Sequence, residues 1–88
     1  MKIVILYKPV SEFATSVEAY AHEFERETSH KLELMDIESK EGISLATVHD
    51  ILRNPVLLAI RDDHSLIELW PERDSWPTVS ELSAYIQR

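Results

Sequence analysis

The sequence predicts an α/β domain with the element order β-α-β-α-β-β-α, a four-stranded mixed sheet with helices on both faces. Two apolar runs, residues 3–7 and 56–60, show no alternation between apolar and polar positions. Such runs are typical of strands that are covered on both faces. Between and after them, apolar residues recur every three or four positions, which is the period of amphipathic helices. Because 88 residues have room for one core, we predict a single domain spanning residues 1–88.

The first strand is predicted at Lys2–Tyr7, and Pro9 ends it. A helix follows from about Ser11. Two starts of this helix remain open: Ser11 could cap it directly, or Thr15 could form a capping box with Glu18 one turn later. With either start, one stripe of the helix is apolar and faces inward: Phe13, Val17, Tyr20, Ala21 and Phe24.

The second strand is predicted at Lys31–Ile37, where apolar and polar residues alternate imperfectly. A polar connection over residues 36–42 contains the only glycine of the chain. We expect a short second helix at about Ile43–Leu52, which Asn54-Pro55 terminates. Its inward residues are expected to be Leu45, Val48, Ile51 and Leu52.

The third strand, Val56–Ile60, is expected to form a hairpin with a fourth strand at Leu66–Trp70. The turn between them contains Asp62, Asp63 and His64, and His64 occupies a position that usually prefers glycine. The first two strands should run parallel, joined by a right-handed crossover, before the hairpin completes the sheet.

A final helix begins with either Thr78 or Ser80 as its cap. The residues of this helix that face inward are predicted to be Val79, Leu82, Tyr85 and Ile86.

The composition excludes several classes of function. Nine Lys and Arg against sixteen Asp and Glu give a net charge of −7, which repels phosphate backbones and anionic headgroups. We therefore predict neither nucleic acid nor membrane as a partner. The chain has no cysteine, which excludes disulfides, thiolate nucleophiles and Cys-ligated metals. This is compatible with a reducing cytoplasm, where we expect the protein to reside.

The element order resembles that of the thioredoxin-like superfamily, in its short, glutaredoxin-sized form. The resemblance covers essentially the whole chain and implies a cis peptide bond before Pro55, next to the start of the first helix. The matching features are Tyr7-Lys8-Pro9 at the end of the first strand, Met35-Asp36-Ile37, Asn54-Pro55 at the cis-proline position, and the Asp62-Asp63 hairpin.

The redox motif of this family, Cys-x-x-Cys or Cys-x-x-Ser, aligns with Ser11-Glu12-Phe13-Ala14. A serine hydroxyl has a far higher pKa than a thiol and forms no disulfide. Dithiol exchange and monothiol deglutathionylation are therefore excluded at these positions. The resemblance implies a redox-inactive thioredoxin-like protein. In redox relatives the cis-proline exposes the backbone of the preceding residue to an extended peptide, and a degenerate copy could keep that groove.

We expect a binding groove at this corner of the fold. Trp70 and Trp76 flank a proline-containing loop and either contact a partner or cover the sheet edge, with Trp76 the more exposed because Trp70 ends a strand. Tyr7 either lines the groove or fills the core. The residues of the hypothetical groove are Tyr7, Ser11, Glu12, Phe13, Ala14, Asn54, Pro55 and Trp76.

The histidines do not indicate a metal site, because none of them has a second histidine at the four-residue spacing that places two ligands on one helix face. Glu18 and His22 are interpreted as a solvated helix pair. We predict no metal ion, no cofactor and no catalytic residue. The four histidines are His22, His30, His49 and His64.

Two functions remain open. The first is a non-catalytic module that binds a protein partner or forms a small homo-oligomer through a helix face or the free edge of the second or fourth strand. The alternative is a protein or enzyme that binds a glutathione-like ligand or another small anion. In that case the free N–H groups of the first helix would hold the anion, with Ser11 or Tyr7 as a hydroxyl donor.

Overall fold

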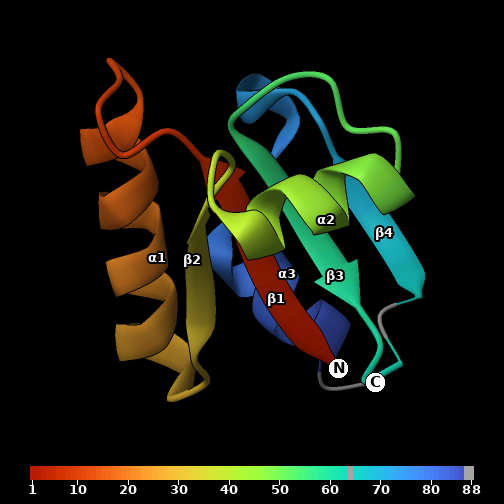
Figure 1. Ribbon diagram of the computed structural model, residues 1–88. Coiled ribbons are helices and arrows are strands. Elements are labelled where there is room, and N and C mark those ends of the chain that lie inside the picture. Colours follow the sequence, from red (N-terminus) through yellow and green to blue (C-terminus); the bar gives the residue numbers. More distant parts are fainter. Residues whose placement is uncertain (64, 87–88) are drawn as a thin grey trace.

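The computed structural model describes residues 1–63 and 65–86, so the prediction for His64 lies outside the described residues. The predicted α/β class and element order are confirmed (Figure 1). The elements are β1 (Lys2–Tyr7), α1 (Ala14–Thr28), β2 (Leu32–Asp36), α2 (Lys40–Val48), β3 (Val56–Ile60), β4 (Leu66–Trp70), the short 3-10 helix η1 (Arg73–Ser75) and α3 (Val79–Ile86).

The four strands form one mixed sheet in the order β2-β1-β3-β4. β1 runs parallel to β2 and antiparallel to β3, and β3 pairs with β4 in an antiparallel hairpin. In this register Ile3 lies between Leu32 on one side and Ala59 on the other. β1 and β3 are therefore the central strands, which explains why their apolar runs are uninterrupted.

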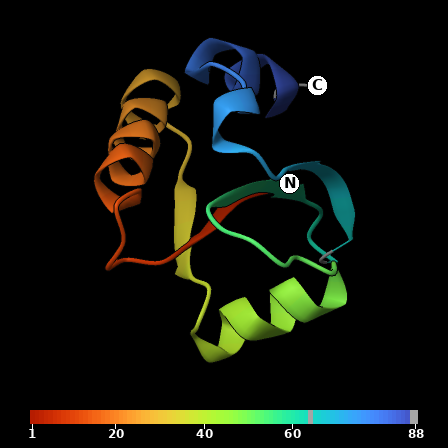
Figure 2. The same cartoon turned by 90° about the horizontal axis from the view of Figure 1, so that it is seen from above.

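The helices form a layer on each side of the sheet, with α1 and α3 on one face and α2 on the other (Figure 2). Successive side chains of a strand point to opposite faces. Ile5 of β1 accordingly packs in the core under α1 and α3, while Val4 and Leu6 pack in the core on the α2 side.

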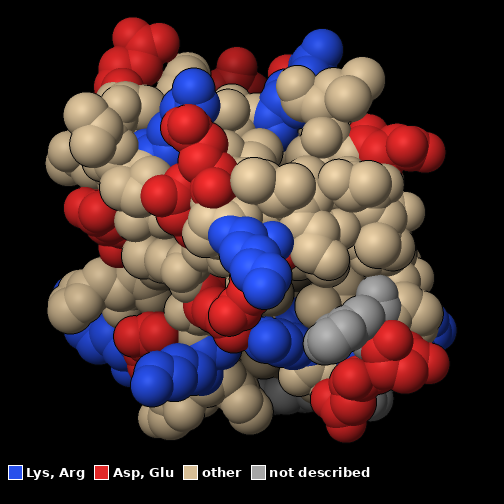
Figure 3. All heavy atoms as spheres, in the orientation of Figure 1, with Lys and Arg blue, Asp and Glu red and all other residues tan. Residues whose placement is uncertain are grey.

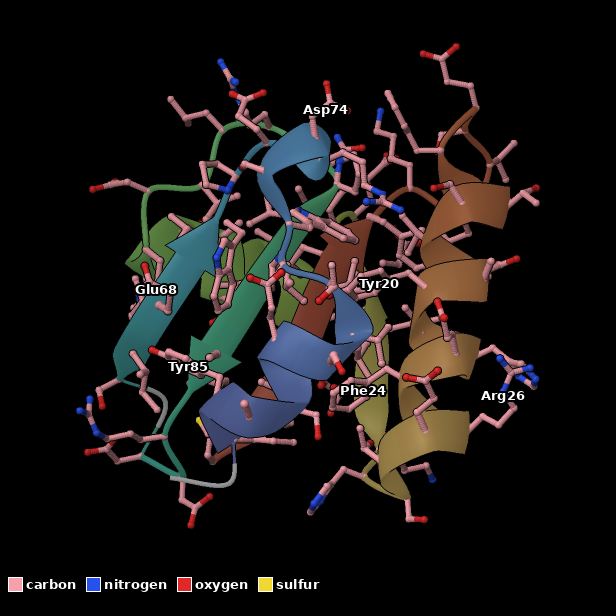
Figure 4. The ribbon with its side chains drawn as sticks, turned by 180° about the vertical axis from the view of Figure 1, so that it is seen from behind. Tyr20, Phe24, Arg26, Glu68, Asp74 and Tyr85 are labelled. Atoms are coloured by element: carbon pink, nitrogen blue, oxygen red, sulfur yellow. The ribbon has the colours of Figure 1, made fainter. Side chains whose placement is uncertain are left out.

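Large aromatic side chains fill the core under α1 and α3. Tyr20 and Phe24 of α1 lie between this helix and α3 (Figure 4), and Phe24 has no exposed surface. The ring of Tyr20 makes an edge-to-face contact with Trp76, with 5.2 Å between the ring centres. On the other side of α3, Tyr85 makes a similar contact with Trp70 of β4 at 5.6 Å.

The start of α1 differs from both predicted alternatives. The helix begins at Ala14, and the preceding Phe13 provides no side-chain cap. The hydroxyl of Ser11 instead donates to the carbonyl of Lys8 at 2.7 Å, within the turn that precedes the helix, and Thr15 already lies inside the helix. Phe13, predicted to face inward, is 39% exposed. The other four predicted residues of the stripe are buried.

α2 begins three residues earlier than predicted because the hydroxyl of Ser39 accepts a hydrogen bond from the N–H of Gly42 at 3.0 Å. A Cβ on Gly42 would lie 2.1 Å from the carbonyl oxygen of Asp36, so this close approach requires glycine. The helix then ends at Val48.

The early end of α2 makes two predicted core positions wrong. Val48 is 70% exposed and Leu52 is 96% exposed, since Leu52 lies in the loop after the helix and Val48 in its last turn. Ile51 is buried as predicted, although it lies outside the helix, and Leu45 is half-buried.

Thr78 is the cap of α3, which decides between the two predicted starts. Its hydroxyl accepts from the N–H of Glu81 at 3.2 Å, and the Glu81 carboxylate accepts from the N–H of Thr78 at 2.9 Å. This is a capping box. The same hydrogen bonds lower the pKa of Glu81. Val79 and Leu82 are buried, while Tyr85 and Ile86 are half-buried against the same core.

Candidate functional site

The corner before β3 contains an open depression of about 330 Å³, which we call the proline groove. It is lined by Phe13, Arg53, Asn54, Pro55 and residues 71–74. The peptide bond between Asn54 and Pro55 is cis, as the family resemblance implies. The fold thus brings Phe13, at the start of α1, next to a loop about forty residues later in the chain.

Asn54 presents an unpaired backbone in this groove. The pairing of β1 with β3 ends at Val56, opposite Leu6. Within residues 1–63 and 65–86, neither the N–H nor the C=O of Asn54 takes part in a backbone hydrogen bond. Backbone groups that are left without a partner are available to an extended segment of another chain.

Charged side chains form the rim of the proline groove. Arg53 and Glu72 make an exposed ion pair. The guanidinium of Arg73 lies over the ring of Trp76, 4.6 Å from its centre, and donates to the hydroxyl of Ser16 at 3.1 Å. Arg73 thereby fastens the loop after β4 to the first turns of α1, and Asp74 completes the rim.

The prediction that Trp76 is the more exposed of the two tryptophans is wrong. The residue is 8% exposed and belongs to the core under α1 and α3. Its indole N–H donates to the carbonyl of Trp70 at 3.0 Å, and its ring packs against Tyr20. Burying an indole costs little free energy when its N–H has a backbone acceptor. Trp76 therefore does not line the groove but packs beneath Arg73, which does.

Tyr7 also belongs to the core, the second of its two predicted roles. It is 7% exposed, and its hydroxyl donates to a carboxylate oxygen of Glu18 at 3.3 Å. Burial, together with the negative charge of Glu18, raises the pKa of Tyr7. This hydroxyl is therefore already used within the fold.

Only one residue of the predicted Ser11–Ala14 corner lines the groove. Phe13 does so, whereas the hydroxyl of Ser11 is engaged with Lys8 and the side chain of Glu12 is exposed outside the lining. Ala14 is half-buried and packs against the core. Of the predicted groove, the structure brings together Phe13, Asn54 and Pro55.

The charged residues of the rim were missed by sequence reasoning. Arg53 directly precedes Asn54, and Glu72 and Arg73 lie in the loop that Trp70 and Trp76 flank. The position of these residues next to predicted groove residues was the only sequence signal for the rim. No motif links the segment around Arg53 to the loop around Arg73. Across the described ranges, no three His, Asp or Glu side chains form a group suited to a metal ion. None of the helices in these ranges is long and apolar enough to span a membrane.

Comparisons with known proteins identify the fold. No protein-family model matches the chain, and no curated protein matches its sequence. The structure is similar to that of thioredoxin 1 from the thermophilic eubacterium Thermosipho africanus, with a TM-score of 0.67 and 15% sequence identity. The match covers 100% of this chain and 92% of that one. The chain has a thioredoxin-like fold.

The likeness concerns the fold, because 15% identity does not carry an activity from one protein to another. This thioredoxin-like chain contains no cysteine. Thiol–disulfide exchange needs a thiolate and is therefore absent. The resemblance inferred from the sequence is confirmed for the fold.

Proposed function

We propose that this protein is a non-catalytic, thioredoxin-like binding module that holds an extended segment of a protein partner in the proline groove. The unpaired backbone N–H and C=O of Asn54, in a depression next to the exposed ring of Phe13, carry the proposal. The absence of cysteine supports a role without redox chemistry and is compatible with a cytoplasmic location.

The groove offers an extended segment two kinds of contact. The backbone of Asn54 supplies hydrogen bonds in the manner of an added strand, which give affinity without selecting a sequence. Phe13, which is 39% exposed, supplies an apolar contact, and aromatic residues often dominate such interfaces. Arg53, Glu72, Arg73 and Asp74 add charges of both signs at the rim, which select among partners by electrostatic complementarity.

Selection of a random peptide library against the full chain, followed by NMR mapping of the bound peptide, tests the proposal. We expect shifts at Asn54 and around Phe13, and a loss of affinity of about tenfold in Phe13→Asp, since a buried aromatic contact is commonly worth more than 1 kcal/mol. Val10→Asp is the matched control, because Val10 is 97% exposed in the same loop and lies outside the groove. Equal binding by both variants would contradict the proposal.

Self-association is the second form of this binding proposal. In the described sheet β2 and β4 are the outer strands, and four of the five residues of β4 are apolar. An edge of this kind can pair with another copy of the chain. Light scattering after size exclusion distinguishes the two forms, and a monomer at high concentration contradicts self-association.

Binding of a small anion is the second candidate function. Two observations favour it: α1 has no side-chain cap, and the Arg73 guanidinium contacts Ser16 in its first turn. Glutathione or succinate should raise the melting temperature if this corner binds a carboxylate. The gain should disappear in Arg73→Gln, and no gain at millimolar concentrations contradicts this candidate.

A further inference from the structure

A second hollow, of about 350 Å³, lies between α2 and the sheet. Its floor is apolar and consists of Val4, Met35, Leu45 and Ile60, and two lysines, Lys2 and Lys40, stand at its rim. We call these six residues the α2 pocket. They include none of the residues that line the proline groove.

The pocket exists because α2 covers the sheet loosely. Gly42 is the one residue of α2 that is buried, and the side chain of Leu45 is half-buried. Ser44, which also borders the hollow, is too small to fill the space. The hollow is open to solvent and mostly apolar, and its volume of about 350 Å³ lies within the range of small-molecule pockets.

Lys40 is the cation at the rim that is available to an anion. Two lysines border the hollow, and basic side chains lie near the centre of this face, with acidic side chains next to them and an uncharged surface beside them (Figure 3). Lys2 is paired with Glu33 at 3.1 Å. Within the described part of the chain Lys40 has no ion pair.

The position of Lys40 adds a second argument. It is the first residue of α2, where the helix dipole favours acidic residues and disfavours a cation. Residue types that are unfavourable for local stability are more common at binding sites than elsewhere. The neighbouring Glu41 also borders the hollow and carries the opposite charge. Its substitution therefore tests whether the hollow prefers a negatively charged ligand.

We propose that the α2 pocket binds a small amphipathic carboxylate of the medium-chain fatty acid class, with the alkyl tail on the apolar floor and the carboxylate at Lys40. Pockets for small molecules range from about 300 to 1,000 Å³, so this hollow suits a short chain. An apolar floor with a cation at its rim matches a molecule with a tail and one negative head.

Sodium octanoate is the probe, used with the full chain in calorimetry and in NMR titrations. We expect saturable binding, with amide shifts in α2 and in the adjoining residues of β1 and β3. Each buried methylene should raise affinity about fourfold, so hexanoate, which is two methylenes shorter, should bind about 15-fold more weakly. Octylamine, which has the same tail and a positive head, should bind more weakly than octanoate.

Paired substitutions at exposed positions locate the site and its charge. Lys40→Gln should weaken octanoate about three- to tenfold, as expected for loss of an exposed charge-assisted contact, whereas Glu41→Gln should tighten it. Lys31→Gln is the matched control, since it removes the same charge outside the pocket. Ser44→Trp should fill the hollow and abolish binding while leaving the fold intact.

Four results would each overturn the proposal: no saturable binding of octanoate, a preference for octylamine, amide shifts confined to the proline groove, or undiminished binding in Ser44→Trp. The last two would show that octanoate binds elsewhere. Because the proline groove is tested by Phe13→Asp with peptides, failure at one site is distinguishable from failure at the other.

Discussion

On one face of the sheet α1 buries four side chains, including Phe24 with no exposed surface, whereas on the other face α2 buries only Gly42. The first face is closed by an aromatic core, in which the hydroxyl of Tyr20 and the indole N–H of Trp76 each donate a hydrogen bond to a backbone carbonyl. The second face retains an open hollow. We infer that the α1 and α3 layer supplies most of the stability and that the α2 layer leaves room for a ligand.

The largest expected difference between the faces is in the cost of truncating a side chain. Phe24→Ala should lower the free energy of unfolding by about 3–5 kcal/mol, because it leaves a cavity in a fully buried core. Leu45→Ala, at a half-buried position of α2, should cost about 1–2 kcal/mol. Urea unfolding of both variants measures the difference, and equal costs would break the comparison.

Gly42→Ala should cost about 2 kcal/mol, because the added methyl group meets the backbone carbonyl of Asp36, which cannot move without shifting the end of β2. Ser44→Ala, at an exposed position of the same helix, is the control and should stay within about 0.5 kcal/mol. If Gly42→Ala were as mild as the control, the tight contact at the start of α2 would not exist.

Tyr20→Phe should cost about 1 kcal/mol at neutral pH, because it removes the hydrogen bond from the hydroxyl to the carbonyl of Pro77 at 2.8 Å. Burial raises the pKa of Tyr20 to about 12, against an effect of Arg73 that lowers it. Since the folded state holds this proton more tightly than the unfolded state, the contribution is complete below about pH 10 and is lost as the pH rises to about 12.

Urea unfolding across this pH range should therefore show a smaller loss of stability in Tyr20→Phe than in the unmodified chain. An identical pH dependence in both proteins would mean that the hydroxyl of Tyr20 is solvated and that water reaches the aromatic core.

The smallest effects should come from two backbone positions with positive φ, Ser29 at the end of α1 (φ 62°) and Asp50 after α2 (φ 53°). Glycine adopts this conformation without steric cost, so Ser29→Gly and Asp50→Gly should each stabilise the protein by up to about 0.5 kcal/mol. Melting temperatures check this. Destabilisation by either variant would show that its side chain makes a contact worth more than the backbone strain.

The central strands and α1 could be predicted from the sequence because burial on both faces, or on one stripe, leaves a continuous apolar pattern. The start of α2 could not, since Ser39 caps a helix whose third residue is Gly42 and not the glutamate of a capping box. The close approach of Gly42 to Asp36 is visible only in three dimensions.

The candidate site was predictable only in part, for a related reason. Asn54-Pro55 and Phe13 were found through the family resemblance. The rim depends on Arg73, whose position over Trp76 arises when α1, η1 and α3 pack together. The same packing buries Trp76, which was predicted to be more exposed than Trp70 because Trp70 ends a strand.

Native-state amide hydrogen exchange tests the difference between the two faces most directly, since it reports the opening free energy of each element in one protein. We predict that the amides of α2 exchange through local opening, with protection at least about tenfold lower than that of the central amides of α1, β1 and β3. Equal protection of α1 and α2, both at the level of global unfolding, would contradict a loosely held α2.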